Sequence, residues 1–371
     1  MSTAKNTVTT SAPAPAVEYA PVAYSAFAVV VANVRQLGAS FLRVTFRSDE
    51  LAHFLVLGLD QRIKLVLPNA EGGLDLFPRE TNDWYAAWRD IPETARPVLR
   101  TYTARTVRPE LGEIDVDFVV HGRTGPATRW VLGAAVGDEI FVIGPDARTR
   151  HPEDSRRVAG AEFAPGTASR VLLAGDETAA PAICSILESL PKKARGQVFI
   201  EVPTTADILP VASPGGVTVC WLARDARPGL ERGAVLDRAV RAWVSEMMPT
   251  GRAAASAVSA PVSVPAPTAG VAAADDLAAD ERAADELAAD DLADDDLADD
   301  DLADDELAEI NVDTDLLWEV PDANGTHDLY AWIAGEAGCI KELRRFLVRD
   351  SGLHRSDVAF MGYWRLGKSE N

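Results

Sequence analysis

The stretch RVLLAGDETAAPAICSILESL, residues 170–190, decides the fold, because it separates two parts of the chain with different patterns. The apolar run from Val171 to Ala174 predicts a buried strand, and Gly175 with its acidic neighbours predicts a turn. The Ala- and Leu-containing remainder predicts a helix. A buried strand that leads directly into an apolar helix is typical of an α/β unit with a parallel sheet. The stretch therefore predicts that an α/β domain begins near residue 166.

The same alternation of strand and helix continues to the end of the chain. Strand-like runs occupy 196–203 and 217–225, a helix-like segment occupies 230–248, a strand and then a helix occupy 329–350, and a last strand occupies 357–364. This alternation predicts a parallel sheet with helices on both faces. We expect the α/β domain to comprise residues 166–250 and 311–371.

Between residues 24 and 145 the chain is dominated by strand-like runs. They occupy 27–37, 40–48, 61–68, 99–106, 113–122 and 138–145, and Gly38 between the first two indicates a hairpin. Near Asp115 and Asp117 apolar and acidic residues alternate, as in a strand with one solvated face. Six short strands predict an antiparallel barrel or sandwich in a domain spanning 21–165.

The net charge of −21 comes mostly from one segment of the 371 residues. Between Ala274 and Ile310 there are 18 Asp and Glu residues against Arg282 alone, so the rest of the chain carries a net charge of only −4. A chain without a surplus of Lys and Arg is not expected to bind nucleic acid. The Ala/Asp/Leu repeat predicts a disordered acidic insertion at 251–310, with an acidic tether for a basic partner or cations as the alternative. Residues 1–20 predict a disordered leader.

The three cysteines, Cys184, Cys220 and Cys339, are far apart in the sequence. Neither a disulfide framework nor a protein-bound metal site is predicted from this spacing. Free thiols are consistent with a reducing cytoplasm, and no stretch approaches the ~18 apolar residues that a membrane span needs. We expect a cytoplasmic monomer.

The segment LRTYTARTV sends Arg100 and Tyr102 to one face of a strand. Downstream, Gly122 and Gly125 predict a tight turn, and residues 127–133 predict a short helix whose free N–H groups favour a phosphate. An arginine, an aromatic ring and such a helix start together describe a flavin nucleotide site. The alternative is a barrel strand with an exposed arginine and a Gly-rich turn.

Several ordered motifs resemble one family. RTYTAR, DFVVHGRTGPATRW and GDEIFVIGP are similar to the flavin domain of the siderophore-interacting proteins, which are ferric-siderophore reductases. LLAGDETAAPAI, YAWIAGEAGCIKELRRFL and FMGYWRLGK resemble their second domain. The resemblance covers roughly residues 24–250 and 311–368. It implies the fold of the ferredoxin–NADP⁺ reductases, an antiparallel flavin-binding β-barrel followed by a parallel-sheet α/β domain that binds a nicotinamide cofactor.

The resemblance implies FAD as the cofactor and assigns residues to it. Arg100 would pair with the flavin phosphate, Tyr102 would stack on the isoalloxazine, and Thr103 would lie near the N5 edge. Tyr102 and Thr103 are therefore the predicted catalytic residues. The other predicted residues of the flavin site are Thr101, His121, Gly122, Gly125, Ala127 and Thr128.

The same resemblance assigns residues 175–179 to the loop on the nicotinamide side of the site. The loop lacks GxGxxG, and by itself it indicates a strand–turn–helix with an acidic N-cap and first turn, so we expect its acids to orient polar groups instead of binding phosphate. Arg224 stands where this fold often binds the 2′-phosphate of NADPH, and an exposed surface arginine is the alternative. The further predicted cofactor-binding residues are Gly175, Asp176, Glu177, Thr178, Ala179, Arg224, Gly335, Glu336, Tyr363 and Trp364.

The resemblance implies a ferric siderophore as substrate. A siderophore saturates Fe(III) with oxygen ligands, so the protein need not supply any. Because ferric siderophores are often anionic, basic side chains would attract them, and Lys64, Arg129 and Arg365 are the predicted substrate-binding residues, with plain surface charge as the alternative. We expect FAD-dependent reduction of the ferric siderophore with electrons from NADPH or NADH, and reduced ferredoxin as an alternative donor. A general flavin or electron-transfer reductase and a non-catalytic siderophore carrier are the alternative functions.

Overall fold

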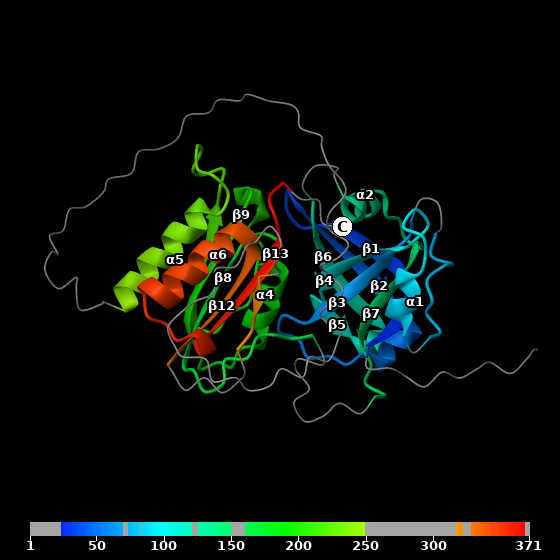
Figure 1. Ribbon diagram of the computed structural model, residues 1–371, viewed down its shortest axis with the longest axis horizontal. Helices are drawn as coiled ribbons and strands as arrows, with labels where there is room; N and C mark the ends of the chain where they lie inside the picture. Colours follow the sequence, from blue (N-terminus) through cyan, green and yellow to red (C-terminus); the bar gives the residue numbers. More distant parts are fainter. Residues whose placement is uncertain are drawn as a thin grey trace, which may run out of the picture.

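The computed structural model shows two domains side by side (Figure 1). It describes residues 24–69, 73–81, 83–120, 125–149, 160–248, 317–321 and 328–367. The predicted leader and the predicted acidic insertion lie outside these residues. Among the described residues, no helix is both long and apolar enough to cross a bilayer.

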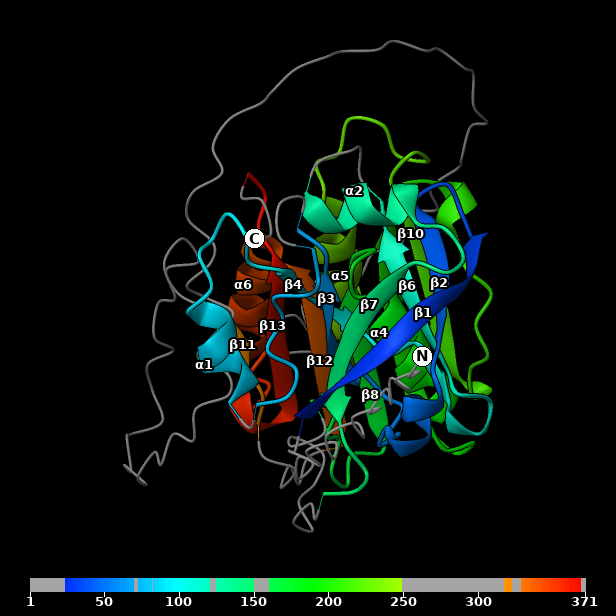
Figure 2. The ribbon, with the colours of Figure 1, turned by 90° about the vertical axis from the view of Figure 1, so that its right-hand side faces the viewer.

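The first domain is a seven-stranded antiparallel sheet that curls into a barrel (Figure 2). Its strands lie in the order β4-β3-β7-β1-β2-β6-β5. Their bounds are β1 (Tyr24–Gln36), β2 (Phe41–Arg47), β3 (Arg62–Leu67), β4 (Val98–Thr103), β5 (Thr106–Arg108), β6 (Glu113–Val119) and β7 (Glu139–Pro145). The edge strands β4 and β5 are separated only by Ala104 and Arg105, so the chain itself joins the two edges of the sheet. The predicted strands and the β1–β2 hairpin are confirmed, except that residues 99–106 form parts of two strands.

Two helices cover this barrel. The predicted helix is α2 (Pro126–Gly133), whose Trp130 stacks on Phe46 of β2 with ring centroids 6.1 Å apart. The sequence did not indicate α1 (Trp84–Arg89), which buries Trp84 and Trp88 in an outer cluster with residues of β3 and β7. The short 3₁₀ segments are η1 (Asp49–His53), η2 (Pro109–Leu111), η3 (Thr205–Asp207) and η6 (Arg355–Asp357), and Phe346–Asp350 forms a π turn, η5.

The expectation that β6 has a solvated acidic face is wrong. Asp115 and Asp117 are only 5% and 3% exposed. The Asp117 carboxylate accepts two hydrogen bonds from Arg43, at 2.6 and 2.8 Å, and Asp115 accepts from Arg108 and Thr45. Alternation correctly separated the two faces of the strand, but neighbouring arginines cover the acidic face because a carboxylate can be buried when it is paired.

The second domain is the predicted parallel α/β sheet. Its strands lie in the order β10-β9-β8-β12-β13-β11, parallel except for the short edge strand β11. The strands are β8 (Arg170–Gly175), β9 (Arg195–Val202), β10 (Gly216–Ala223), β11 (Trp318–Glu319), β12 (Leu329–Glu336) and β13 (Val358–Trp364). The apolar side of α4 (Ala180–Ser189) packs on one face. Those of α5 (Ala234–Met247) and α6 (Ala337–Arg345) pack on the other, as Figure 1 shows.

The strand order creates a switch point between β8 and β12. From β8 the chain moves outward through β9 and β10, and it then returns to the other side of β8 with β12 and β13. In open α/β sheets ligands bind beside the carboxyl ends of the strands at such a point. The carboxyl ends of β8 and β12 carry Gly175 with Asp176 and Gly335 with Glu336, so four predicted cofactor-binding residues lie there.

A buried carboxylate, Asp60, joins the two domains just before β3. One of its oxygens accepts hydrogen bonds from the backbone N–H groups of Glu162 and Phe163, and the other accepts from Trp332 Nε1 of β12 at 2.8 Å. Burial raises the pKa of Asp60 to about 6. This carboxylate therefore ties the barrel to the interdomain linker and to the middle of the second sheet.

Further hydrogen bonds cross the interface, among them one to Asp207 and two to Glu188. The backbone N–H of Ser40, in the β1–β2 turn, donates to the Asp207 carboxylate at 2.5 Å. Arg105, in the link between β4 and β5, donates two hydrogen bonds to Glu188 of α4 at 2.6 and 2.7 Å. The carboxyl end of β4 is thus held close to the α/β domain.

Candidate functional site

Strand β4 presents Arg100 and Tyr102 on the same face, as alternation predicts. In the antiparallel register Arg100 stands opposite Leu65 and Tyr102 opposite Ile63, and these two β3 residues belong to the buried barrel core. Directly opposed residues in a sheet share a face, so Arg100 and Tyr102 lie on the core side at the edge of the barrel. Both side chains are half-buried, which leaves part of each available to a ligand.

The ring of Tyr102 belongs to an aromatic row that leads to α2. It lies 4.5 Å from the ring of Phe118 in β6, and Phe118 lies 6.0 Å from Trp130 of α2, both as centroid distances. A partly exposed tyrosine packed on other rings keeps a fixed orientation, which is what a stacking partner for a flat ligand requires. Strand β4 and helix α2 therefore meet on one aromatic cluster.

The start of α2 can accept a phosphate. Gly125 precedes it with φ of +80°, a conformation that favours glycine, and no heavy atom lies within 4 Å of where its Cβ would be. Gly125 offers no side chain to cap the helix and Pro126 has no N–H, so among the described residues no side chain occupies the N–H groups of Ala127 and Thr128. Together with the guanidinium of Arg100, these groups fit the pyrophosphate of a flavin dinucleotide. Predicted residues Ala127 and Thr128 lie in this first turn, whereas His121 and Gly122 lie outside the described residues.

The three predicted substrate-binding cations come from separate elements. Lys64 stands opposite Thr101 in the β3–β4 pair, and Thr101 is exposed on the face opposite Arg100 and Tyr102. Arg129 is exposed on α2, and Arg365 follows β13. Their shared role in binding a siderophore stays a prediction.

A series of contacts connects the end of β4 with the end of β13. Thr103 stands opposite Arg62 in the sheet, and the Arg62 guanidinium lies 4.4 Å from the ring centroid of Trp318 in β11. Trp318 stacks on Tyr363 with centroids 5.8 Å apart and planes inclined by 18°. The predicted flavin residues and the predicted nicotinamide-side residues are therefore neighbours across the domain interface. Neither Arg62 nor Trp318 was singled out from the sequence. The one sequence signal near Arg62 is the polar run of Asp60 and Gln61 that precedes it.

At the carboxyl end of β8, Asp176 organises the switch point. Its buried carboxylate accepts from the N–H and Oγ1 of Thr178, from the N–H of Glu336 and, at 2.7 Å, from Trp364 Nε1. Burial, together with the neighbouring Glu177, raises the pKa of Asp176. Gly335 has φ of +146°, and a Cβ there would come within 2.8 Å of the carboxylate. Asp176 thus orients polar groups, as the sequence analysis expects.

The neighbouring acid, Glu177, is fully buried and paired with arginines. Its carboxylate accepts two hydrogen bonds from Arg224, at 2.8 and 2.9 Å, and lies 3.1 Å from Arg232. Arg224 also donates to the buried Glu201 at 3.2 Å, and its side chain is 15% exposed. The 2′-phosphate role of Arg224 stays a prediction. Sequence analysis missed Arg232, although it lies within the predicted helix 230–248, directly before Gly233, the N-cap residue of α5.

The described residues contain no metal-binding cluster. No group of three or more His, Cys, Asp or Glu side chains there is arranged to hold a metal ion. Cys184, Cys220 and Cys339 are free thiols, and burial raises the pKa of Cys184 to about 12. Such a thiol is protonated at neutral pH and is a poor nucleophile.

Comparison with protein families matches nearly the whole described chain. Residues 30–149 match the siderophore-interacting FAD-binding domain, and residues 168–367 match the model of the siderophore-interacting proteins. Two solved structures share the fold, each over 94% of this chain. They are the siderophore-interacting protein SipS from Aeromonas hydrophila (TM-score 0.55, 22% identity, 94% of its chain) and a siderophore utilization protein from T. fusca (TM-score 0.56, 23% identity, 96% of its chain).

Curated relatives are similar over about half of this chain. Ferric vibriobactin reductase ViuB of Vibrio cholerae is 34% identical over 191 residues, which are 52% of this chain and 64% of ViuB. An NADPH-dependent ferric-chelate reductase of Escherichia coli is 28% identical over 201 residues, which are 53% of this chain and 71% of that protein. The chain thus spans slightly less than two thirds of ViuB.

Proposed function

Because the chain belongs to the siderophore-interacting protein family, we propose that it is an FAD-dependent reductase of ferric siderophores. The observation that carries this proposal is the combination of Arg100, Tyr102 and the uncapped start of α2, inside the residues that match an FAD-binding domain. When bound, FAD would supply the chemistry that links a two-electron hydride donor to the one-electron acceptor Fe(III). The hard oxygen ligands of a siderophore bind Fe(II) far less tightly than Fe(III), so reduction releases the iron.

In this proposal the barrel residues bind and orient the flavin. Arg100 and the N–H groups at the start of α2 neutralise its pyrophosphate, and Tyr102 stacks on the isoalloxazine while packed against Phe118. Thr103 lies at the end of β4, beside the domain interface, where its hydroxyl would contact the N5 edge. No general base or nucleophile is needed, because the residues contribute placement and electrostatics only.

In this proposal the α/β domain binds the electron donor. NADPH or NADH binds at the switch point near Asp176 and Glu336, with the nicotinamide directed toward the end of β13. The ferric siderophore approaches the flavin edge near Lys64, Arg129 and Arg365, whose charges attract an anionic chelate. We place the reaction in the cytoplasm, where these reduced dinucleotides occur.

Anaerobic mixing tests the proposed function. FAD-loaded protein is mixed with NADPH, NADH or reduced ferredoxin, the flavin absorbance is followed to bleaching, and a panel of ferric siderophores is added. We expect bleaching by a nicotinamide donor and recovery with formation of Fe(II), trapped by a colorimetric chelator. Protein that stays colourless with FAD would refute the flavin site. Faster reduction of free flavins than of any ferric chelate would identify a general flavin reductase. Siderophore binding without recovery of the flavin absorbance would identify a carrier.

Tyr102→Ala is expected to change the redox behaviour of the flavin more than its retention. The variant loses the stacking ring, worth about 1 kcal/mol, but keeps Arg100 and the α2 start. The flavin reduction potential, measured by spectroelectrochemistry, should shift while the bound flavin fraction stays near the wild-type value. Tyr102→Phe is the matched control, because it keeps the ring and should leave the potential close to that of the wild type. Equal potentials for the alanine variant and the wild type would contradict the stacking role.

A further inference from the structure

At the switch point, several N–H groups at the helix starts already donate hydrogen bonds within the protein. In α4, the N–H of Ala180 donates to the backbone carbonyl of Asp176, and Pro181 has no N–H. The N–H of Thr178, just before the helix, donates to the Asp176 carboxylate at 2.9 Å. A phosphate at this helix would have to displace the protein's own carboxylate.

Carboxylates also cap the two helices on the other face. Glu201, fully buried at the end of β9, accepts from the N–H groups of Gly233 and Leu236 at the start of α5, at 2.7 and 3.0 Å. Glu336 accepts from the N–H of Cys339 in α6 at 2.8 Å. At the start of α2 in the barrel, by contrast, no side chain among the described residues forms such a cap. A phosphate-bearing donor must therefore find its positive partner among side chains.

Arg232 is the side chain positioned for that role. Its guanidinium lies 4.7 Å from the ring centroid of Trp364 and forms an ion pair with Glu177 at 3.1 Å. Its side chain is 28% exposed, against 15% for Arg224, which is held by three hydrogen bonds to two buried acids. A guanidinium stacked on an aromatic ring still directs its in-plane N–H groups outward, which suits bidentate contact with a phosphate.

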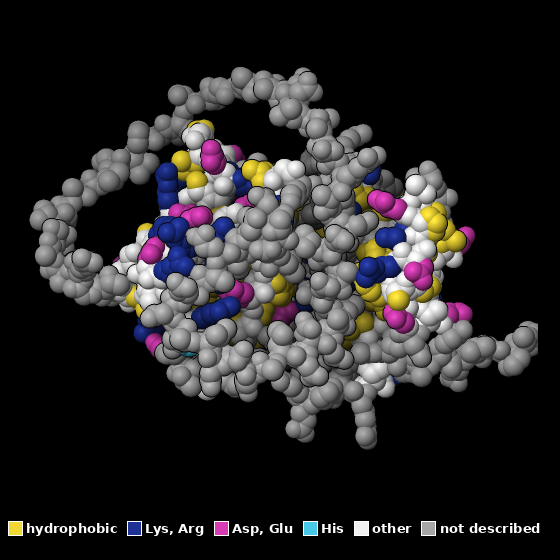
Figure 3. Space-filling view, in the orientation of Figure 1, with side chains coloured by type: hydrophobic (Ala, Val, Ile, Leu, Met, Phe, Trp, Pro, Cys, Tyr) yellow, Lys and Arg dark blue, Asp and Glu magenta, His cyan; other side chains and the backbone are white. Residues whose placement is uncertain are grey.

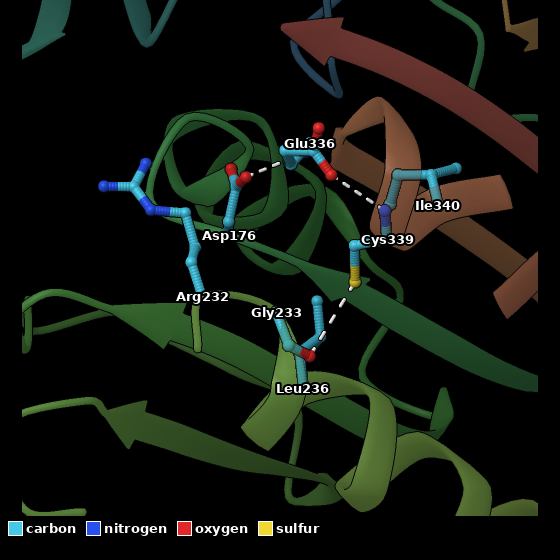
Figure 4. A pocket seen from close by; sticks show the side chains of 8 residues that line it. Asp176, Arg232, Gly233, Leu236, Glu336, Cys339 and Ile340 are labelled. Carbon is cyan, nitrogen blue, oxygen red and sulfur yellow. Dashed lines mark hydrogen bonds between the residues drawn. The ribbon is translucent and has the colours of Figure 1, made fainter. Parts of the chain in front are cut away.

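The surroundings of Arg232 fix its position. Together with Asp176 and Glu336 it lines a small pocket at the switch point, where Figure 4 shows Arg232 and Asp176 on one side and Glu336 with Cys339 on the other. Trp364, on which the guanidinium stacks, is itself held by its hydrogen bond to Asp176. Glu177 keeps its two hydrogen bonds from Arg224 when Arg232 moves, so its charge is not left alone in the interior.

We propose that Arg232, stacked on Trp364, binds the diphosphate of the nicotinamide dinucleotide in place of a helix N-terminus. This inference rests on the proposed function, because it specifies how that function's electron donor is held. NADPH and NADH share the diphosphate and differ only in the 2′-phosphate. Arg232 therefore contributes affinity for both dinucleotides and does not select between them.

Binding of oxidised dinucleotides to the FAD-loaded protein tests this inference without turnover. We expect Arg232→Ala to raise the Kd of NADP⁺ and of NAD⁺ by a similar factor of about 10 to 100 in calorimetric titrations, the range of a lost charge-assisted bidentate contact. Arg232→Lys keeps the charge but not the planar fork, so its Kd values should fall between those of the other two proteins. Inorganic pyrophosphate should compete with NADP⁺ in the wild type and not in Arg232→Ala.

The matched control is Arg238→Ala. Arg238 is exposed on α5, where Figure 3 shows Lys and Arg side chains gathered over α5 and α6, and it is not a residue of the pocket. Both Kd values should remain at the wild-type level in this variant, and thermal denaturation checks that each variant is folded. Any general effect of removing one positive charge would appear equally in both alanine variants.

Three outcomes would overturn the inference. These are unchanged Kd values in Arg232→Ala, a rise for NADP⁺ alone, which would make Arg232 a reader of the 2′-phosphate, and no binding of either dinucleotide by the wild type. A separate measurement isolates the proposed function. Protein reduced chemically with dithionite and freed of excess should reduce a ferric siderophore in the wild type and in Arg232→Ala alike. Failure of the wild type in that assay refutes the function, whereas failure of the titrations alone refutes only the role of Arg232.

Discussion

Arg100→Ala will bind FAD about 10- to 100-fold more weakly than the wild type, which corresponds to the ~1.5–3 kcal/mol of a charge-assisted hydrogen bond to an anion. The guanidinium lies on the same face of β4 as Tyr102, at an edge of the barrel whose nearby helix start, α2, offers only backbone N–H groups. Removing it leaves the pyrophosphate with no fixed positive charge from β4. The measurement is the Kd of FAD for the apoprotein, followed by quenching of flavin fluorescence.

Arg35→Ala is the control for this prediction. Arg35 is exposed in β1, so the variant loses a positive charge of the same domain outside the predicted site. It should bind FAD like the wild type at the same ionic strength. An Arg100→Ala variant that retains FAD as tightly as Arg35→Ala would exclude Arg100 from the flavin site.

Asp60→Ala is expected to lower the free energy of unfolding by about 3 kcal/mol, because it leaves buried donors without an acceptor at a cost of about 1–3 kcal/mol each. These donors are Trp332 Nε1 and the N–H groups of Glu162 and Phe163. Part of the loss is offset, because the variant no longer buries a carboxylate. Urea denaturation followed by tryptophan fluorescence measures the effect.

A double-mutant cycle with Trp332→Phe isolates the contact between the domains. Phenylalanine keeps most of the apolar volume but removes the indole N–H, so the cost of losing Asp60 should be smaller in the Trp332→Phe background. Simple addition of the two single-variant losses would mean that the hydrogen bond contributes nothing to stability. Unfolding in two separate transitions for Asp60→Ala would show that this carboxylate couples the domains.

Asp60 should also leave a signature in the pH dependence of stability. Its pKa of about 6 in the folded protein lies above the ordinary 3.8, so the folded state binds its proton more tightly than the unfolded state does. Its contribution is therefore greatest below pH 4 and is lost as the pH rises to about 6, a change of about 3 kcal/mol. Asp60→Asn cannot titrate, so the wild type minus Asp60→Asn difference in unfolding free energy should fall over this interval. A constant difference would contradict the assignment.

The paired acids of the barrel, Asp115 and Asp117, show what a sequence pattern does not predict. Alternation in β6 correctly assigned Asp115 and Asp117 to the face away from the core, and solvent exposure was expected from their charge. The arginines that cover this face come from β2, β5 and the β4–β5 link. Which charges meet across strands depends on sheet register, and single-sequence periodicity does not contain it.

The candidate site divides in the same way. The Arg–Tyr face of β4, the start of α2 and the loop after β8 could be identified from short motifs, because each feature is local. Arg62, Trp318 and Arg232 could not, because their roles depend on neighbours far away in the sequence: Tyr363 for Trp318, and Trp364 for Arg232.

By itself the sequence determined the order of strands and helices, the change from an antiparallel to a parallel sheet near residue 170, and the motifs of the family. Hydrophobic periodicity and turn residues encode these features over a few neighbouring positions. Only the tertiary structure decided which donors and charges are already used within the protein. The carboxylates Asp176, Glu201 and Glu336 occupy helix starts that a phosphate would otherwise bind, whereas no side chain in the described part of the chain caps α2. The reason is physical, since a hydrogen-bond donor serves a ligand only when no acceptor of the folded chain has reached it first.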